Sequence, residues 1–252
     1  MPSPSPTERV ARHLAGTLAG EVRTDLLTRS LYATDASHYE ILPVAVVLPR
    51  SADDVVRTVR FCARERIPLL PRGGGTSLAG QAVGAAVVLD FTRHMDRILA
   101  IDPEKQTCTV EPGVVLSRLD AALAPRRLRF PPDPASATRC AVGGCIGNNA
   151  TGCHSLVYEK TDGYLRSLDL VLADGTQVTT APGAWGEGAR PGGPGSTGRS
   201  PFAEAGRMIL GARDAILAAY PDLRRNVSGY NLRGVVERER FDPARLVAGS
   251  EG

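Results

Sequence analysis

The chain has 252 residues, of which 42% are apolar, and its formal net charge at pH 7 is +3. This length and composition allow a sizeable core in one large domain or two small ones. The small net charge, with both signs interspersed, argues against a nucleic-acid partner, and no apolar run reaches the roughly 20 residues of a membrane-spanning helix.

The N-terminus, Met-Pro-Ser-Pro-Ser-Pro, lacks the charged-then-apolar pattern of a secretory signal. We therefore expect a cytoplasmic protein and leave peripheral attachment to a membrane open. Cysteines are odd in number and widely spaced, without a C-x-x-C pair, which predicts neither a disulfide framework nor a metal site. They are Cys62, Cys108, Cys140, Cys145 and Cys153.

Residues 1–40 are predicted to be an N-terminal lead-in, with a helix over 7–19 capped by Thr7. Residues 41–180 are predicted to form the core of the protein. It opens with a β-branched strand at 44–48, followed by a helix over 52–66 that is capped by Ser51 and shows one apolar face. A second strand at 67–70 then leads into a glycine-rich stretch.

That stretch, residues 71–82, reads Pro-Arg-Gly-Gly-Gly-Thr-Ser-Leu-Ala-Gly-Gln-Ala. Successive glycines let backbone amides converge on an anion, and the two hydroxyls add donors, so the pattern favours phosphate binding over a plain surface turn. A Walker loop is excluded because Gln81-Ala82 stands where Lys-Ser/Thr is required. A dinucleotide fingerprint needs a helix next, whereas residues 85–90 read as a buried strand.

Three strands are expected after this loop, at 86–90, 97–101 and 107–111, followed by a helix over 114–125. Residues 131–134, Pro-Pro-Asp-Pro, should then break regular structure.

A second concentration of glycine and asparagine occupies residues 140–152. Such a loop lets the backbone lie against a flat ligand such as a ring system, and Asn149 offers both donors and an acceptor. The alternative is a stack of turns.

The remaining elements are a hairpin, an insert and a helix. Asp174-Gly175 is expected to turn a hairpin between 168–172 and 177–180. Residues 181–201, rich in glycine and proline, are predicted to be a flexible insert, and their Trp185 is assigned no role. Residues 202–252 begin with a helix over 202–220 and end on a loop after a strand-like run near Leu246, so we expect the chain to be truncated.

Four of these segments together resemble the FAD-binding domain of FAD-linked oxidases of the vanillyl-alcohol oxidase type. They are residues 71–82, 132–152, 168–175 and 249–252. The resemblance implies an α+β fold in which FAD lies between two α+β subdomains, here truncated before the substrate-binding cap. A finer resemblance, to the glycolate oxidase and D-lactate dehydrogenase branch and to its iron–sulfur-containing members, is carried by 147–155, Lys160-Thr161 and 227–232.

The resemblance also implies a set of cofactor-binding residues. Those for the FAD diphosphate would be Arg72, Gly73, Gly74, Gly75, Thr76, Ser77 and Leu78. Those lining the ribityl chain and the isoalloxazine would be Pro132, Asp133, Ser136, Gly143, Gly144, Asn148 and Asn149, with Gly249 and Glu251 as weaker candidates. Some relatives attach flavin through a histidine in the first loop; residues 73–77 contain none, so the FAD is expected to be non-covalent. Glu159, where many relatives have glycine, departs from the pattern.

The implied function is the oxidation of a 2-hydroxy acid, resembling glycolate or D-lactate, by hydride transfer to FAD. Catalytic residues are not assigned; we expect them beyond residue 252, and the electron acceptor and oligomeric state are left open. No C-x-x-C-x-x-C run is present, so an iron–sulfur cluster would belong to a region outside this sequence. Two alternatives stand: a reductase of the same fold that acts on a UDP-sugar enol ether, and a non-catalytic binding module.

Overall fold

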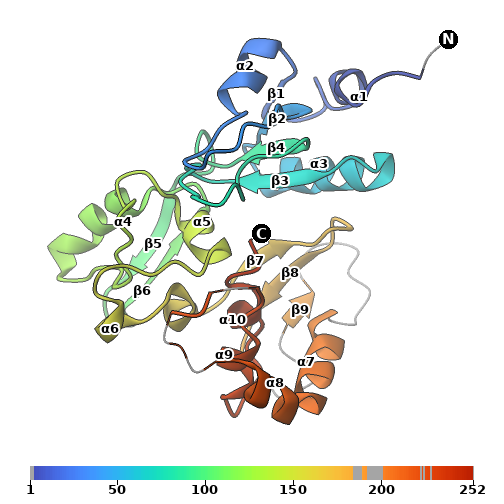
Figure 1. The fold of residues 1–252 in the computed structure, drawn as a ribbon. Coiled ribbons are helices and arrows are strands. Elements are labelled where there is room, and N and C mark those ends of the chain that lie inside the picture. Colours follow the sequence, from blue (N-terminus) through green and yellow to red (C-terminus); the bar gives the residue numbers. More distant parts are fainter. Residues whose placement is uncertain are drawn as a thin grey trace. The chain divides into compact units, whose positions relative to one another are not determined.

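The computed structural model describes residues 3–183, 189–191, 201–221, 223, 225–227 and 229–251. The chain divides into two compact units. Unit 1 comprises residues 1–130, 136–144 and 173–175, and unit 2 comprises residues 131–135, 145–172 and 176–252. Each unit combines helices with strands (Figure 1), so the predicted α+β class is confirmed.

Unit 1 is built on a four-stranded sheet in the order β1-β2-β4-β3. The strands are β1 (Glu21–Arg23), β2 (Ala45–Leu48), β3 (Leu69–Arg72) and β4 (Val87–Asp90). Strands β2 and β3 both pair in parallel with β4, whereas β1 is antiparallel to β2. Every residue of β2 and β4 is buried, which explains why their sequences are continuously apolar rather than alternating, apart from Asp90 at the end of β4.

Helix α3 (Ala52–Glu65) connects β2 to β3 as predicted. It begins where Ser51 Oγ accepts a hydrogen bond from the Asp54 amide at 3.3 Å, and it ends at Arg66, whose φ of 53° is left-handed. Buried Asp54 in turn accepts hydrogen bonds from the amides of Ala19, Gly20 and Arg50, each at 2.9 Å. This carboxylate therefore ties the segment before β1 to the end of β2.

The N-terminal segment differs from the prediction. Helix α1 (Pro6–His13) is capped by Ser5 and ends six residues before Ala19, the expected terminus. Ser5 and Glu8 form a capping box, while the Thr7 hydroxyl donates to the Val44 carbonyl at 2.9 Å instead of capping. Helix α2 (Leu26–Leu31) and strand β1 were not predicted, because both are short and their sequences show no clear apolar periodicity.

The rest of unit 1 follows the prediction closely. Strands β5 (Ile98–Asp102) and β6 (Thr107–Val110) pair as an antiparallel hairpin. Helix α4 (Leu116–Leu123) buries Leu116, Leu119 and Leu123 and continues into the 3-10 turn η1 (Ala124–Arg126).

The sequence predicted a loop for the second glycine-rich stretch. The structure instead places helix α5 (Val142–Gly147) within it. Its start is held by tertiary hydrogen bonds, from the Val142 amide to Val114 O and from the Gly143 amide to Pro112 O, both at 2.9 Å. These contacts outweigh the low helix propensity of its glycines.

Unit 2 begins with short helical turns, α6 (Ser155–Tyr158) and η2 (Thr161–Tyr164). The predicted hairpin follows, formed by β7 (Asp169–Val171) and β8 (Gln177–Thr180), with Gly175 at a φ of 80° in the turn. Strand β9 (Ala189–Pro191) extends this sheet beside β8. It lies within the predicted insert, of which residues 184–188 and 192–200, including Trp185, are outside the described residues.

Two expectations for residues 202–252 were wrong. The single helix over 202–220 is divided into α7 (Pro201–Gly211) and α8 (Arg213–Ala219), because Ala212 leaves the helical region. The strand-like run near Leu246 belongs to helix α10 (Pro243–Val247), which follows α9 (Leu232–Val236). Asp242 caps α10 by accepting a hydrogen bond from the Ala244 amide at 3.1 Å. The prediction missed this cap because the residues that follow it are mainly apolar.

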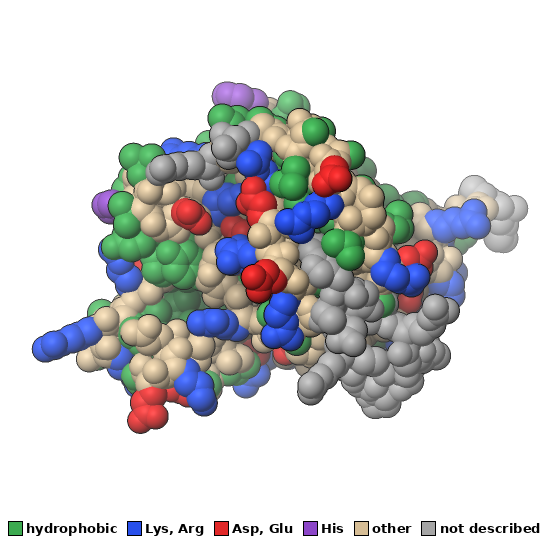
Figure 2. Space-filling view, turned by 90° about the horizontal axis from the view of Figure 1, so that it is seen from below, with side chains coloured by type: hydrophobic (Ala, Val, Ile, Leu, Met, Phe, Trp, Pro, Cys, Tyr) green, Lys and Arg blue, Asp and Glu red, His purple; other side chains and the backbone are tan. Residues whose placement is uncertain are grey.

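The face shown in Figure 2 carries Lys and Arg side chains intermixed with Asp and Glu side chains. This mixture follows the interspersed charges of the sequence, which has 30 basic and 27 acidic residues.

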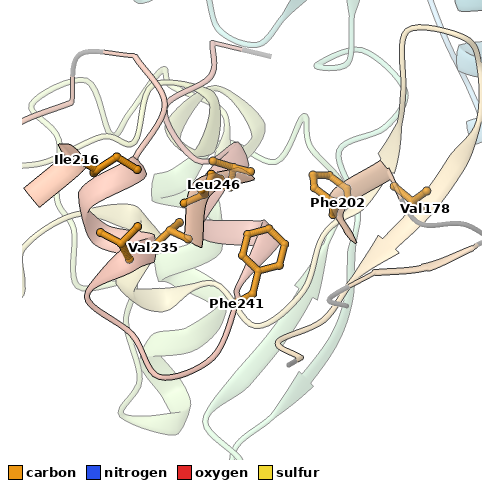
Figure 3. Packing of buried hydrophobic residues seen from close by; sticks show 8 residues of the cluster. Val178, Phe202, Ile216, Val235, Phe241 and Leu246 are labelled. Atoms are coloured by element: carbon orange, nitrogen blue, oxygen red, sulfur yellow. The ribbon is translucent and has the colours of Figure 1, made fainter. Parts of the chain in front are cut away.

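The core of unit 2 is a cluster of aliphatic and aromatic side chains from its sheet and its four C-terminal helices. Figure 3 shows Phe241 with Val235 and Leu246 nearby, and Phe202 beside Val178 of β8. Phe241, Val235 and Val236 have no exposed surface. Burial of such side chains contributes roughly 1.5–3 kcal/mol each, so this cluster anchors α7–α10 on the sheet.

Candidate cofactor-binding site

The first glycine-rich stretch leaves the carboxyl end of β3, where Arg72 pairs with Asp90 of the parallel strand β4. In open α/β sheets, ligands bind beyond the carboxyl ends of the strands. The guanidinium of Arg72 donates to the carbonyls of Tyr32 at 3.3 Å, Thr34 at 2.9 Å and Ala82 at 2.8 Å. Arg72 therefore fixes both ends of the loop to the chain beside it.

The amides of residues 73–78 form a continuous row of donors. Among the described residues, none of these six amides donates a hydrogen bond to the protein, and neither do the hydroxyls of Thr76 and Ser77. The loop is held instead by the Gly75 carbonyl, which accepts from the Ala36 amide at 3.1 Å. This part of the chain thus offers an anion up to eight hydrogen-bond donors without breaking any bond of the fold.

Two glycines of this loop allow it to pack on the segment at 139–144. A Cβ at Gly74 would lie 2.2 Å from the Arg139 carbonyl oxygen, and one at Gly73 would lie 3.1 Å from the Ala141 Cβ. Gly75, at a φ of 63°, would place a Cβ 2.5 Å from Arg72 Nη2. The structure therefore brings the first predicted loop into contact with the start of the second.

The second stretch contains both crowded and open glycines. Gly143 leaves no room for a Cβ, which would lie 2.8 Å from the Pro112 Cβ. Gly144 is exposed, and a Cβ there would meet no atom of the described residues within 4 Å. Ser136 starts the segment, its carbonyl accepting from the amides of Arg139 at 2.7 Å and Cys140 at 2.8 Å. Gly144 is thus a position that the fold of the chain leaves accessible.

The predicted residues of unit 2 also come together. Asn148 Nδ2 donates to Glu251 Oε1 at 2.9 Å, and the amides of Gly249 and Glu251 donate to carbonyls of α5 at 3.0 and 2.9 Å. Asn149 is only 1% exposed, and its Oδ1 accepts from the Asp162 amide at 2.9 Å. The side chain of Asn149 therefore faces the interior, where it shapes the turn.

Asp162 is a supporting residue that the sequence did not reveal. Its carboxylate Oδ2 accepts from Asn231 Nδ2 and from Arg245 Nη1, both at 2.9 Å, and it is 4% exposed. A buried charge of this kind needs such partners. Because the partners lie about 70 and 80 residues later in the chain, no local pattern could have indicated them.

Pro132 is buried, and its neighbour Asp133 contacts the segment at 152–154. Asp133 accepts hydrogen bonds from the His154 amide at 3.4 Å, from the His154 ring and from the Cys153 thiol at 3.4 Å. Burial opposes ionisation of Asp133, but these hydrogen bonds outweigh it and lower its pKa. The same contact raises the pKa of the Cys153 thiol. The sequence showed Cys153-His154 only as an isolated pair.

Among the described residues, none of the helices combines the length and apolarity needed to cross a bilayer.

A mostly parallel sheet whose strand β3 ends in a donor-rich loop, packed on a segment with an accessible glycine, is an arrangement suited to binding a nucleotide cofactor. Residues 43–181 match the family model described as FAD binding domain. The chain belongs to this FAD-binding domain family.

Relatives and solved structures are consistent with this assignment. The chain is 36% identical over 238 residues to D-2-hydroxyglutarate dehydrogenase of Escherichia coli, covering 92% of this chain and 23% of that protein. It is 39% identical over 155 residues to glycolate oxidase subunit GlcD of Bacillus subtilis, covering 60% and 33%. The chain thus spans about a quarter of the length of the dehydrogenase.

Two solved structures share the fold. The chain is similar to 4-ethylphenol oxidase from Gulosibacter chungangensis, with a TM-score of 0.58, 25% identity and coverage of 76% of this chain and 36% of that one. The similarity to alkyldihydroxyacetonephosphate synthase has a TM-score of 0.61 at 20% identity, covering 83% and 39%. The predicted resemblance to FAD-linked oxidases is confirmed.

Proposed function

We propose that the chain is the FAD-binding portion of a flavoprotein oxidoreductase that oxidises a 2-hydroxy acid of the glycolate, D-lactate or D-2-hydroxyglutarate kind. The observation that carries the FAD site is the row of unpaired donors at residues 73–78. The names of the relatives, a D-2-hydroxyglutarate dehydrogenase and a glycolate oxidase subunit, support the class of substrate.

The first loop would hold the FAD diphosphate. Main-chain amides suit a diphosphate because they supply several partial positive charges without an ordered side chain, and Thr76 and Ser77 add hydroxyl donors. Arg72, whose guanidinium is engaged with three carbonyls, would act by positioning the loop. Leu78 is 80% exposed and would contribute through its amide.

The second stretch would provide contact area for the rest of the cofactor. Gly144 leaves space for a ligand to approach the main chain. The other residues predicted for this part of the cofactor are Ser136 and Gly143 in unit 1 and Pro132 and Asp133 in unit 2. Asn148, joined to Glu251, and the turn at Asn149 and Gly249 would complete the set. FAD supplies a hydride acceptor when bound, and these residues would bind and orient it.

Flavin retention tests the cofactor assignment. The purified chain, incubated with FAD and passed through gel filtration, should elute with bound flavin at about one equivalent. A colourless protein with a folded circular dichroism spectrum would contradict the proposal. Acid precipitation should release all of the flavin into the supernatant, because residues 72–78 contain no histidine or cysteine to bond it covalently; flavin in the pellet would refute non-covalent binding.

The substrate class needs a separate test on the protein in its full natural length, since the chain spans only 23% of the dehydrogenase relative. Anaerobic addition of D-2-hydroxyglutarate, glycolate or D-lactate should bleach the flavin absorbance, and at least one of the three acids should do so. Bleaching by NADPH, with no response to the hydroxy acids, would contradict the oxidation of a 2-hydroxy acid while leaving the FAD site intact.

A further inference from the structure

We propose that Asp133, Cys153 and His154 form a binding site for a thiophilic divalent transition metal ion, with Zn²⁺ as the best match. Cys153 Sγ lies 3.4 Å from Asp133 Oδ2 and 3.4 Å from His154 Nδ1. The Asp133 carboxylate and the His154 ring are themselves in contact, and one ligand atom from each residue lies within 4.8 Å of the other two. All three residues belong to unit 2.

The spacing of these atoms suits a tetrahedral ion. Zinc binds sulfur at about 2.3 Å and nitrogen or oxygen at about 2.0–2.1 Å, which places neighbouring ligand atoms about 3.3–3.6 Å apart. Both sulfur distances, 3.4 Å, lie close to the ~3.5–3.6 Å expected between sulfur and nitrogen or oxygen ligands of zinc. The carboxylate and the imidazole, which are in direct contact, would need to move apart to admit the ion between them. Binding would convert the Cys153 thiol to a thiolate and release its proton, with no change of oxidation state.

The two chain segments that supply the ligands are fixed in contact with each other. Gly152 has no space for a Cβ, which would lie 2.0 Å from the Asp133 carbonyl oxygen. On the other side, Arg225 donates to the Gly152 carbonyl at 3.1 Å and to Ser155 Oγ at 2.6 Å. The backbone on both sides of Cys153 and His154 is therefore held, which reduces the conformational cost of collecting the ligands.

The donor set and its exposure indicate the kind of ion. A thiolate and an imidazole favour zinc or another late first-row transition metal ion over Mg²⁺ and Ca²⁺, which prefer oxygen ligands. The His154 side chain is 57% exposed and the Asp133 side chain 32%, so solvent can reach the cluster. Three protein ligands with solvent access leave a fourth position for water or for a further ligand.

Cobalt and zinc titrations test this site directly. Chelator-treated, FAD-free protein titrated with Co²⁺ should develop tetrahedral d–d absorption and a thiolate-to-cobalt charge-transfer band that saturate at one equivalent. Zinc should abolish both signals, and competition with a chromophoric chelator gives its affinity. Cys153→Ser should remove the charge-transfer band, and His154→Asn should weaken zinc binding at least about tenfold.

The matched control is Cys108→Ser, a half-buried thiol in β6 of unit 1, which should leave every signal unchanged. The exposed positions of Cys153 and His154 allow both variants to fold, which circular dichroism checks. Absence of a thiolate band in the unaltered protein, or a band that survives Cys153→Ser and disappears with Cys108→Ser, would overturn the proposal. Neither result depends on flavin binding, so this test is independent of the proposed function.

Discussion

The two glycine-rich stretches have opposite hydrogen-bonding properties. In the first, six successive amides at 73–78 are unpaired among the described residues, and Gly74 is required by a close contact with the Arg139 carbonyl oxygen. In the second, the amides of Val142, Gly143, Asn149 and Ala150 are all paired within the protein, but Gly144 is open. The first stretch can therefore bind an anion through its donors, whereas the second offers a surface that a ligand can approach closely.

The largest expected effect comes from Gly74→Ala, which tests whether the first loop is seated on the second stretch. The added Cβ would lie 2.2 Å from the Arg139 carbonyl oxygen, so one segment must move. We expect a loss of about 3 kcal/mol in the free energy of unfolding, measured by urea denaturation. Gly211→Ala is the control and should cost nothing, because a Cβ there meets no atom within 4 Å in the part of the chain that the structure describes. Equal stability of the two variants would contradict the close contact between Gly74 and the Arg139 carbonyl oxygen.

Gly144→Ala should separate ligand approach from folding. Because the position is open and helical, alanine should leave stability unchanged or raise it by up to about 1 kcal/mol. The methyl group would obstruct a cofactor at this surface, so FAD affinity should fall at least about tenfold, or ~1.4 kcal/mol. Fluorescence titration with FAD measures the change, with Gly211→Ala again as the control. Unchanged affinity would remove Gly144 from the cofactor site.

Removal of the two hydroxyls should have a smaller effect on the first stretch. Thr76→Val and Ser77→Ala are each expected to weaken FAD binding about threefold, the amount typical of one hydrogen bond in a solvated site. Stability should not change, because neither hydroxyl has a protein partner among the described residues. Thr109→Val, an exposed threonine on β6, is a suitable control in the same titration. A loss of stability in the Thr76 or Ser77 variant would assign these hydroxyls to the fold.

The last effect concerns the neighbourhood of Gly143, which packs on Pro112. The preceding residue, Glu111, binds Arg97 through Oε1 at 2.8 Å. Burial opposes the ionisation of Glu111, but hydrogen bonds from Arg97 outweigh it and hold its pKa below the ordinary 4.5. Ionised Glu111 therefore stabilises the fold above pH 4.5, and this contribution is lost as the pH falls through the lowered pKa.

In Glu111→Gln, stability at pH 7 should be lower, and the loss of stability between pH 5 and pH 3 should be smaller than in the unaltered protein, on the order of 1 kcal/mol. Thermal melts across this range measure both quantities. Parallel stability curves for the two proteins would show that the Arg97 contact does not bias the ionisation of Glu111.

Local signals in the sequence were sufficient to predict most of the helices and strands of unit 1. The apolar runs of β2 and β4, the Ser51 cap of α3 and the Asp174-Gly175 turn each act within a few residues, so their elements were predicted correctly. The error at α5 arose because distant contacts decide the structure: the helix is glycine-rich, yet its start is held by carbonyls of Pro112 and Val114. The error at α10 is different, because its cap is the adjacent residue Asp242, a local signal that the prediction overlooked.

The candidate site was predictable to a similar extent. The glycine loop at 73–78 was evident from composition, whereas the packing of Gly74 on Arg139 spans 65 residues and could not be read locally. The predicted site residues remain predictions, but the structure brings Gly73 and Gly74 against the segment that contains Gly144, and Asn148 against Glu251. Asp162 and its partners, and the contact of Asp133 with Cys153 and His154, required the folded chain.

The carboxylate of Asp54 has a consequence for the dynamics of the N-terminal region. It accepts hydrogen bonds from the amides of Ala19 and Gly20, before β1, and from the amide of Arg50, after β2. Because a single acceptor serves both segments, the opening event that frees one of these protons should free the others, and the three amides should exchange with deuterium at similar rates. Asp54→Asn would replace one acceptor oxygen by a donor, so exchange at these three positions should accelerate together while the amides of β4 keep their protection.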